Sequence, residues 1–142
     1  MDPVELTARR EALGLSIKAF SEVLDIRERS LTRWEAGVTE PRDWSWLHDA
    51  LLGMEDYLTD LIDEMVTNAD TVYEATGQIG LISYDSRGAF YQWHPDARVQ
   101  QWPGAGSGVP VEMHRVASAR AAVILRQKYG DAPVNIAAVP KP

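Results

Sequence analysis

The chain has 142 residues, of which 45% are hydrophobic, and its formal net charge is −7 at pH 7. This length accommodates one domain, or two small ones that share a core. The sequence contains no cysteine, which excludes disulfides and thiolate chemistry, and no apolar run reaches the roughly 18 residues of a membrane span. Because no charged-then-apolar signal peptide is present either, we expect a cytoplasmic protein without a membrane partner.

The negative charge is concentrated in the middle of the chain. Residues 1–43 carry seven Lys or Arg and nine Asp or Glu. Residues 44–76 carry no Lys or Arg and eight Asp or Glu, and residues 77–142 carry seven Lys or Arg and four Asp or Glu. The parts therefore have charges of −2, −8 and +3. Because the local field at a contact face decides association with DNA, the overall acidity does not exclude a nucleic-acid partner. It does predict weak non-specific binding, since few phosphates would be neutralised.

The first two predicted helices are short and well delimited. Asp2 is a good N-cap and Pro3 suits a first turn, so the first helix should run to about Leu13, where Gly14 ends it. Ser16 is a good N-cap for the second helix. The apolar side of this second helix consists of Ile17, Phe20, Val23 and Leu24.

The third predicted helix is rich in arginine. Leu31 and Trp34 have the spacing of one helix face and form its expected buried pair. Six polar residues then point largely outward: Arg27, Glu28, Arg29, Ser30, Thr32 and Arg33. A short helix that buries two apolar residues and presents three guanidinium groups has the form of a DNA recognition helix. Asp25 tolerates left-handed geometry, and with Glu28 it is one candidate pair for capping an early start of this helix.

The stretch from Leu15 to Gly37 resembles the helix-turn-helix of the lambda-repressor/Cro-like (XRE) regulators. The family's ending of aromatic, acid, any residue and glycine is present as Trp34-Glu35-Ala36-Gly37, and Pro41 follows at the usual distance. The likeness runs without gaps over residues 6–43, so it implies a DNA-binding domain over residues 1–43. The DNA-binding residues that it implies are Lys18, Arg27, Glu28, Arg29, Ser30, Thr32 and Arg33.

The same resemblance divides these residues by role. It implies that Glu28, Arg29 and Arg33 point at base edges, while the remaining polar residues of the third helix lie nearer to phosphates or flanking bases. Arg bridges guanine O6 and N7 with two hydrogen bonds, and Glu accepts from cytosine N4. We therefore expect a site that is rich in G·C pairs.

A long helix is predicted to begin at Asp43 and to reach about Tyr73. Its apolar residues recur at alternating steps of three and four, which is a heptad seam. The seam consists of Trp44, Leu47, Leu51, Met54, Leu58, Leu61 and Met65. Two interpretations stay open: the helix only covers the domain core, or it also contributes to a subunit interface. Gly53 within it marks either a kink or a close contact.

Residues 77–142 are predicted to alternate short strands with helices. A strand at 81–84 is followed by a helix that Asp85 or Ser86 caps, and this helix ends at His94 and Pro95. A Gly-rich loop at 98–110 contains Trp102, which is either an exposed aromatic with a role or a plug at the edge of the core. The next helix, 113–129, has Val116, Ala119, Val123 and Leu125 among its apolar positions. A final strand at 134–139 should pair with the first.

The expected fold class is therefore mainly α with a small β component. An N-terminal helix-turn-helix bundle is joined by the long helix to a C-terminal helix-strand domain, which with that helix spans residues 44–142. The second half resembles the YdiL-like and anti-CRISPR-associated autorepressors in the stretches 81–85 and 90–96 and in the helix from Met113. That resemblance implies a homodimer that represses its own operon at an inverted repeat, and it makes RNA a conceivable second ligand of the basic face.

The sequence contains no pattern of catalytic or metal-ligating residues. His48, His94 and His114 are scattered and fit no HExxH or paired Cys/His spacing, and His94 is expected to cap or pack. We therefore expect no enzyme, no cofactor and no metal. The favoured function is a sequence-specific, DNA-binding transcriptional regulator. The alternative is an antitoxin-like or adaptor protein whose second half binds a protein partner through the acidic helix or the Trp102 loop.

Overall fold

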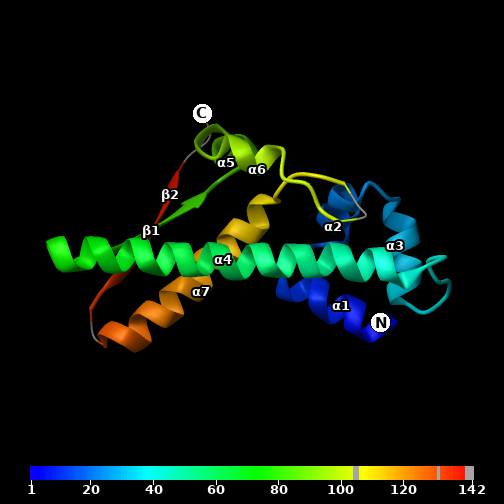
Figure 1. The fold of residues 1–142 in the computed structure, drawn as a ribbon, viewed down its shortest axis with the longest axis horizontal. Coiled ribbons are helices and arrows are strands. Elements are labelled where there is room, and N and C mark those ends of the chain that lie inside the picture. Colours follow the sequence, from blue (N-terminus) through cyan, green and yellow to red (C-terminus); the bar gives the residue numbers. More distant parts are fainter. Residues whose placement is uncertain (104–105, 131, 140–142) are drawn as a thin grey trace.

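The computed structural model describes residues 1–103, 106–130 and 132–139 of an elongated molecule that is organised along one long helix (Figure 1). In chain order the elements are α1 (Pro3–Ala12), α2 (Ile17–Leu24), α3 (Glu28–Glu35), α4 (Trp44–Thr76), β1 (Ile79–Tyr84), α5 (Arg87–Trp93), α6 (Pro95–Arg98), α7 (Val111–Tyr129) and β2 (Val134–Val139). The predicted fold class, mainly α with a small β component, is confirmed. None of the described helices is long and apolar enough to cross a membrane.

The local signals at the N-terminus place the helices as expected. The side chain of Asp2 accepts a hydrogen bond from the Glu5 backbone N–H at 2.8 Å, and Ser16 accepts one from the Ala19 N–H at 3.0 Å. Asp25 ends α2 in the left-handed conformation with φ 54°. Because Asp25 serves as this C-cap, it forms no capping pair with Glu28, and α3 begins after Arg27 without a side-chain cap.

Helix α4 is longer than predicted and its buried stripe shifts along its length. Asp43 caps its start, and Gly77, in a left-handed conformation, ends it. The heptad seam is buried from Leu47 to Leu58, but Leu61 and Met65 are only half-buried, and Ile62 and Ala69 take their places. A straight α-helix has 3.6 residues per turn and not 3.5, so a heptad stripe drifts around it.

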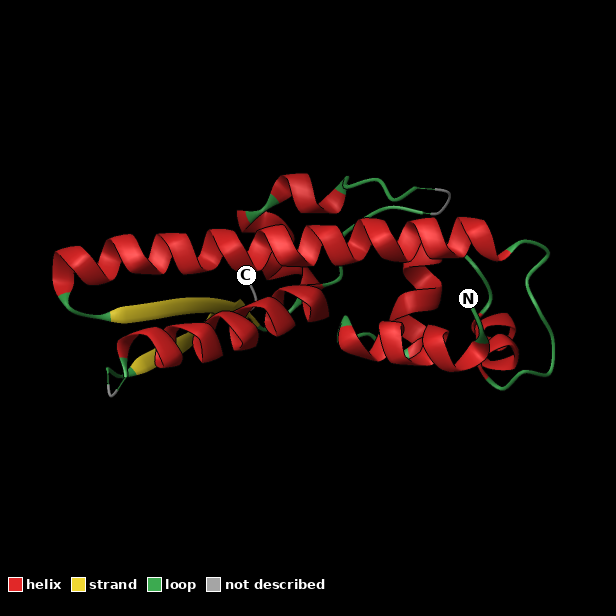
Figure 2. Cartoon of the chain, turned by 60° about the horizontal axis from the view of Figure 1, so that its bottom comes forward, coloured by secondary structure: helices red, strands yellow, loops and turns green. Residues whose placement is uncertain are grey.

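The two strands form a parallel pair, with Ile79 opposite Val134 and Tyr84 opposite Val139. Strand β1 packs against both α4 and α7 (Figure 2). The buried face of α7 in this region consists of Ala121, Ala122 and Leu125. Ala119 and Val123, which were expected on the apolar side of α7, are exposed. The alanines that are buried belong to the adjacent face of this helix and are Ala117, Ala121 and Ala122.

One hydrophobic core joins the helix-turn-helix helices to the second half. It contains Leu6, Phe20 and Leu31 from α1–α3, Leu51 from α4, and Met113 from α7 among other residues. The boundary predicted between residues 43 and 44 coincides with the start of α4 and remains a prediction.

Helix α7 also approaches the turn after α1. At Gly14, whose φ is +78°, a Cβ atom would lie 2.3 Å from Cγ2 of Val116. Glycine is the residue that accepts both this left-handed conformation and this close approach.

Part of the predicted loop at 98–110 packs into the molecule. Trp102 is only 4% exposed, donates from Nε1 to the Gly108 carbonyl at 2.9 Å, and meets the edge of Tyr57. The interpretation as an exposed aromatic is therefore wrong, and the interpretation as a plug is confirmed. Gly53 marks a close contact, since a Cβ there would lie 2.8 Å from Cδ of Pro103. Residues 104 and 105 of the Gly-rich run lie outside the described residues.

Candidate nucleic-acid interface

The apolar face of α3 holds this helix against its neighbours. Leu31 is fully buried, and Trp34 is half-buried against the core. The ring of Trp34 meets Trp46 of α4 edge to face, with centroids 6.2 Å apart. Trp46 therefore contributes to anchoring α3. The predicted buried pair of α3, Leu31 and Trp34, is confirmed, with Trp34 less deeply placed than Leu31.

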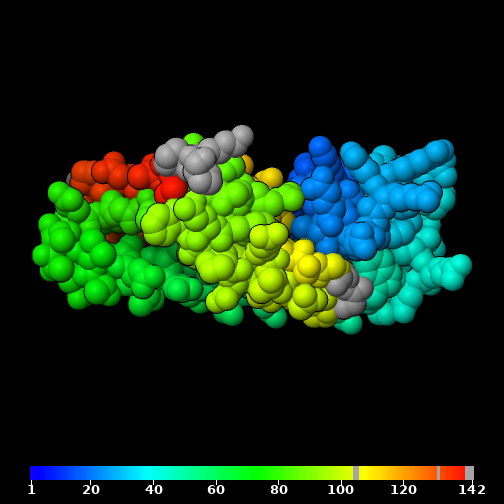
Figure 3. Space-filling model, turned by 90° about the horizontal axis from the view of Figure 1, so that it is seen from above, coloured from blue at the N-terminus to red at the C-terminus, as the bar shows by residue number. Residues whose placement is uncertain are grey.

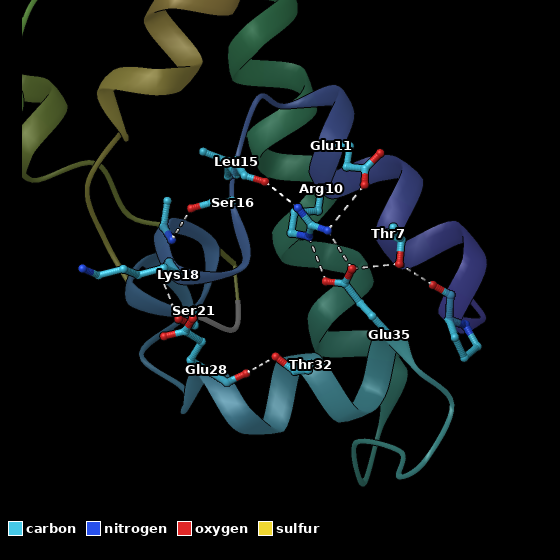
Figure 4. Close-up of polar contacts among 12 residues, drawn as sticks. Thr7, Arg10, Glu11, Leu15, Ser16, Lys18, Ser21, Glu28, Thr32 and Glu35 are labelled. Carbon is cyan, nitrogen blue, oxygen red and sulfur yellow. Dashed lines mark hydrogen bonds and ion pairs between the residues drawn. The ribbon is translucent and has the colours of Figure 1, made fainter.

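A buried ion pair holds the C-terminal end of α3 to α1 (Figure 4). Arg10 donates to the two carboxylate oxygens of Glu35, each at 2.8 Å, and its third nitrogen donates to the Leu15 carbonyl at 2.7 Å. The Thr7 hydroxyl donates to Glu35 at 2.8 Å. No sequence pattern predicted this network. The signal available was Glu35 itself, the acid in the Trp34-Glu35-Ala36-Gly37 ending.

The opposite face of α3 is polar and open to solvent. Arg27, Glu28, Arg29, Thr32 and Arg33 are exposed, and Ser30 is half-buried. Together with Thr39, four of the predicted residues line one shallow depression of about 360 Å³; these four are Arg27, Arg29, Ser30 and Arg33. Thr39 was not predicted, although its hydroxyl lies in the turn that follows the glycine of the family ending.

The three guanidinium groups of this face carry charge that the described residues do not neutralise. Within the described ranges, no carboxylate lies within ion-pair distance of Arg27, Arg29 or Arg33. By contrast, Arg10 and Arg87 pair with Glu35 and Glu22. The positive field at α3 is therefore available to an outside partner in a chain whose net charge is negative.

Thr32 and Lys18 are placed differently from the arginines. The Thr32 hydroxyl donates to the Glu28 carbonyl at 3.0 Å, one turn back in the same helix, so its oxygen can still accept a hydrogen bond from a partner. Lys18 is exposed in the first turn of α2 and lines a separate depression with Arg87 and Glu112 from the second half. The structure therefore does not bring Lys18 into the arginine cluster.

Three features together are typical of a helix-turn-helix that binds DNA: α3 presents an open basic face, the turn at Asp25 is left-handed, and the inner face of α3 is held by packing and an ion pair. Residues 6–43 match the family model described as Helix-turn-helix. No curated protein matches the chain. The matched residues are those whose sequence resembles the XRE-like regulators, and they end at the residue before α4. The match supports a DNA-binding transcription regulator. It does not extend into residues 44–142.

The histidines are arranged in a way that the sequence spacing did not indicate. His48 lies beside Arg9, with 2.8 Å between Nδ1 and Nη1. His94 and His114, 20 residues apart, lie with ring centroids 5.7 Å apart, and His94 Nε2 is 2.8 Å from the Tyr84 hydroxyl. Within the part of the chain that the structure describes, no cluster of three or more His, Asp or Glu side chains is placed to hold a metal ion.

Proposed function

We propose that this protein is a homodimeric transcriptional repressor that inserts α3 of each subunit into the major groove of an inverted-repeat operator. The observation that carries the proposal is the set of three guanidinium groups on the exposed face of α3, none of which pairs with a carboxylate of the described residues. The other face of this helix is fixed by a buried ion pair and by Leu31. A fixed helix presents its side chains in one orientation, as the reading of bases requires.

The side chains of this face suit particular contacts. Arg29 and Arg33 would bridge O6 and N7 of guanine, and Glu28 would accept from N4 of cytosine. Arg27, Ser30 and Thr32 would contact phosphates or flanking bases, and Lys18 would reach the phosphate backbone beside α2. A G·C-rich half-site follows from this assignment.

The open edge of the sheet supports dimerisation. Among the described residues, β2 pairs only with β1, so its second edge has no strand neighbour. The carbonyl of Val139 accepts from the Asp85 N–H and hence faces β1, so the N–H and C=O of Ala138 face outward. The side chain of Ile136 in β2 is also apolar and exposed, with 44% of its surface accessible. Such an edge pairs readily with another chain.

We infer that β2 of two subunits pair antiparallel about a two-fold axis. This contact is self-complementary, as a two-fold dimer requires, and it would join the two small sheets into one of four strands. Figure 3 shows α2 and α3 at one end of the molecule and β2 towards the other, so this pairing leaves both recognition helices free. A palindromic operator would then match the symmetry of the protein. Following the resemblance of the second half, we place this operator in the protein's own promoter.

The experiment that tests this function is selection of bound fragments from a genomic DNA library by the full chain, with the molar mass in solution measured on the same sample. We expect a dimer that enriches an inverted repeat with half-sites about one helical turn apart. A stable chain that enriches no DNA sequence would contradict the repressor. If the protein enriched no DNA sequence but copurified with one other protein in stoichiometric amount, the adaptor function would replace the repressor function.

A backbone variant tests the dimer contact separately. Ala138→Pro removes an N–H that faces outward and leaves the bonds to β1 in place, so it should block edge pairing while the subunit stays folded. Ala138→Ser keeps the N–H and is the matched control. We expect the proline variant alone to become monomeric and to lose operator affinity. A proline variant that remains dimeric would show that another surface holds the dimer.

A further inference from the structure

A second candidate site lies in the other half of the molecule, away from α3. A cavity of about 220 Å³ opens between the second half of α4 and β1. Met65, Val72 and Ile82 form much of its apolar wall. Val72 is 49% exposed and Ile82 is 53% exposed, so these two side chains form an apolar mouth that is open to solvent.

The cavity also has a polar part, which is built from three rings. Tyr84, His94 and His114 line it, and the Tyr84 hydroxyl lies 2.8 Å from His94 Nε2. His114 is only 4% exposed, and its ring centroid lies 4.9 Å from that of Tyr84. The hydrogen-bonding capacity of Tyr84 and His94 is thus partly used within the cluster.

His114 has an unused hydrogen-bonding atom. Its Nδ1 is buried and has no hydrogen-bond partner among the described residues. A buried polar atom without a partner costs about 1–3 kcal/mol. A phenylalanine at this position would pack beside Phe90 without that cost. His114 lines the cavity although its Nδ1 is covered, so a molecule bound there would supply the missing partner once the ring turns.

The surroundings select the charge of such a molecule. Burial, together with the neighbouring His94, lowers the pKa of His114 to about 4, so its imidazole is neutral at neutral pH. The described residues that line the cavity include no Asp, Glu, Lys or Arg. A charged ligand would lose its hydration there without gaining a counter-ion. An uncharged ligand fits.

The volume limits the size of the ligand. It equals about seven water molecules at roughly 30 Å³ each. Pockets for drug-sized ligands begin at about 300 Å³, so the occupant is smaller than these.

We propose that this cavity binds a small uncharged alcohol or phenol. Its apolar body would lie against Met65, Val72 and Ile82, and its hydroxyl would hydrogen-bond to the imidazole of His114. The histidine ring needs only a rotation about its broad χ2 torsion to present a nitrogen to the ligand. This site is independent of the DNA-binding function and does not rest on it.

The test is a titration of the full chain followed by NMR, with the imidazole nitrogens and the methionine methyl groups as reporters. The probe is 4-methylphenol, and benzoate is its charged counterpart. We expect saturable shifts at His114 and Met65 with a Kd of about 1 mM or tighter. His48, which lies beside Arg9, should not respond. Benzoate should bind at least about tenfold more weakly, because its charge has no partner.

Three variants assign the binding to this cavity. Val72→Trp fills the mouth and should abolish the shifts, whereas Val123→Trp, at an equally exposed valine of α7 outside the lining, should leave them unchanged. His114→Phe keeps a packed ring and should weaken 4-methylphenol about tenfold, the equivalent of one hydrogen bond. Absence of saturable shifts, or equal losses in the two tryptophan variants, would overturn the proposal. So would a change of molar mass with Val72→Trp alone, which would assign the mouth to a subunit contact.

Discussion

Arg10 of α1 and Glu35 of α3 form an ion pair with two hydrogen bonds inside the helix-turn-helix unit. Their side chains are only 10% and 8% exposed. The hydrogen bonds to Glu35 raise the pKa of Arg10, so this guanidinium stays charged wherever the protein is folded. The pair bridges the first helix to Glu35, the last residue of α3, and it therefore orients the exposed face of α3 that we propose as the DNA-binding surface (Figure 4).

Breaking this pair should destabilise the fold strongly. Glu35→Gln leaves the buried guanidinium with only the exposed carboxylate of Glu11, 3.7 Å away, as a counter-ion, and we expect a loss of about 3–5 kcal/mol in the free energy of unfolding. The double variant Arg10→Met with Glu35→Leu removes both charges and should lose less stability than Glu35→Gln or than Arg10→Met alone. Denaturant unfolding of the three variants measures this. A cost below about 1 kcal/mol for Glu35→Gln would mean that the pair is as weak as a surface salt bridge.

The exposed arginines of α3 should affect DNA binding and not folding. Arg29→Ala and Arg33→Ala each remove a side chain that pairs with no described carboxylate, so the thermal midpoint should stay within a few degrees. Affinity for the selected operator should fall by about 1–3 kcal/mol per variant. Arg126→Ala, an equal charge change on the exposed face of α7, is the control. Unchanged affinity in both α3 variants would show that the DNA docks elsewhere.

The buried histidine should make stability depend on pH. The folded-state pKa of His114 is lowered to about 4 from 6.5, so the unfolded chain binds the proton more readily than the folded one. Above pH 6.5 the ring is mostly neutral in both the folded and the unfolded chain, so its titration adds no further change, and stability is lost as the pH falls from 6.5 to about 4. Between pH 7 and pH 5 this amounts to about 2 kcal/mol.

Urea unfolding at these two pH values checks the histidine prediction. His114→Gln should abolish most of the difference, whereas His48→Gln, at an exposed histidine, should retain it. An unchanged difference in the His114 variant would attribute the pH dependence to other groups.

The contact between Gly14 and Val116 should couple the turn after α1 to α7. Gly14→Ala places a methyl group 2.3 Å from Val116 Cγ2 and forces alanine into a left-handed conformation, so we expect a loss of about 1–3 kcal/mol. Adding Val116→Ala should relieve the clash but not the backbone strain. A double-mutant cycle with a favourable coupling of at least about 0.5 kcal/mol is expected. Strict additivity would mean that the backbone conformation alone causes the loss.

Much of the fold follows from local sequence signals. Asp2, Ser16 and Ser86 cap helices as expected, and Gly77 ends α4. These features depend on residues within one turn of each other, so a single sequence contains them. The outward set on α3 was predictable for the same reason, because Leu31 and Trp34 fix which side of the helix faces inward.

The features that the sequence did not predict depend on distant residues. Arg10 and Glu35 are 25 positions apart, and no periodicity relates them. His94 and His114 meet only because α5 and α7 pack against the same strand end. The later part of the heptad seam, Leu61 and Met65, is only half-buried for a different reason, because a straight α-helix has 3.6 residues per turn and the stripe drifts around it. The roles assigned to individual DNA-binding residues remain predictions.

Helix α4 runs uninterrupted over 33 residues, from the turn after the recognition helix to the strand pair, a length of about 50 Å. A single continuous helix therefore joins the helix-turn-helix unit to the strand pair. In the proposed dimer, the distance and rotation between the two recognition helices would be set by the protein alone. Inserting about five base pairs between the half-sites turns one of them to the opposite side of the duplex, and a rigid dimer then cannot contact both half-sites at once. The operator should therefore tolerate substitutions in its spacer but not changes in spacer length.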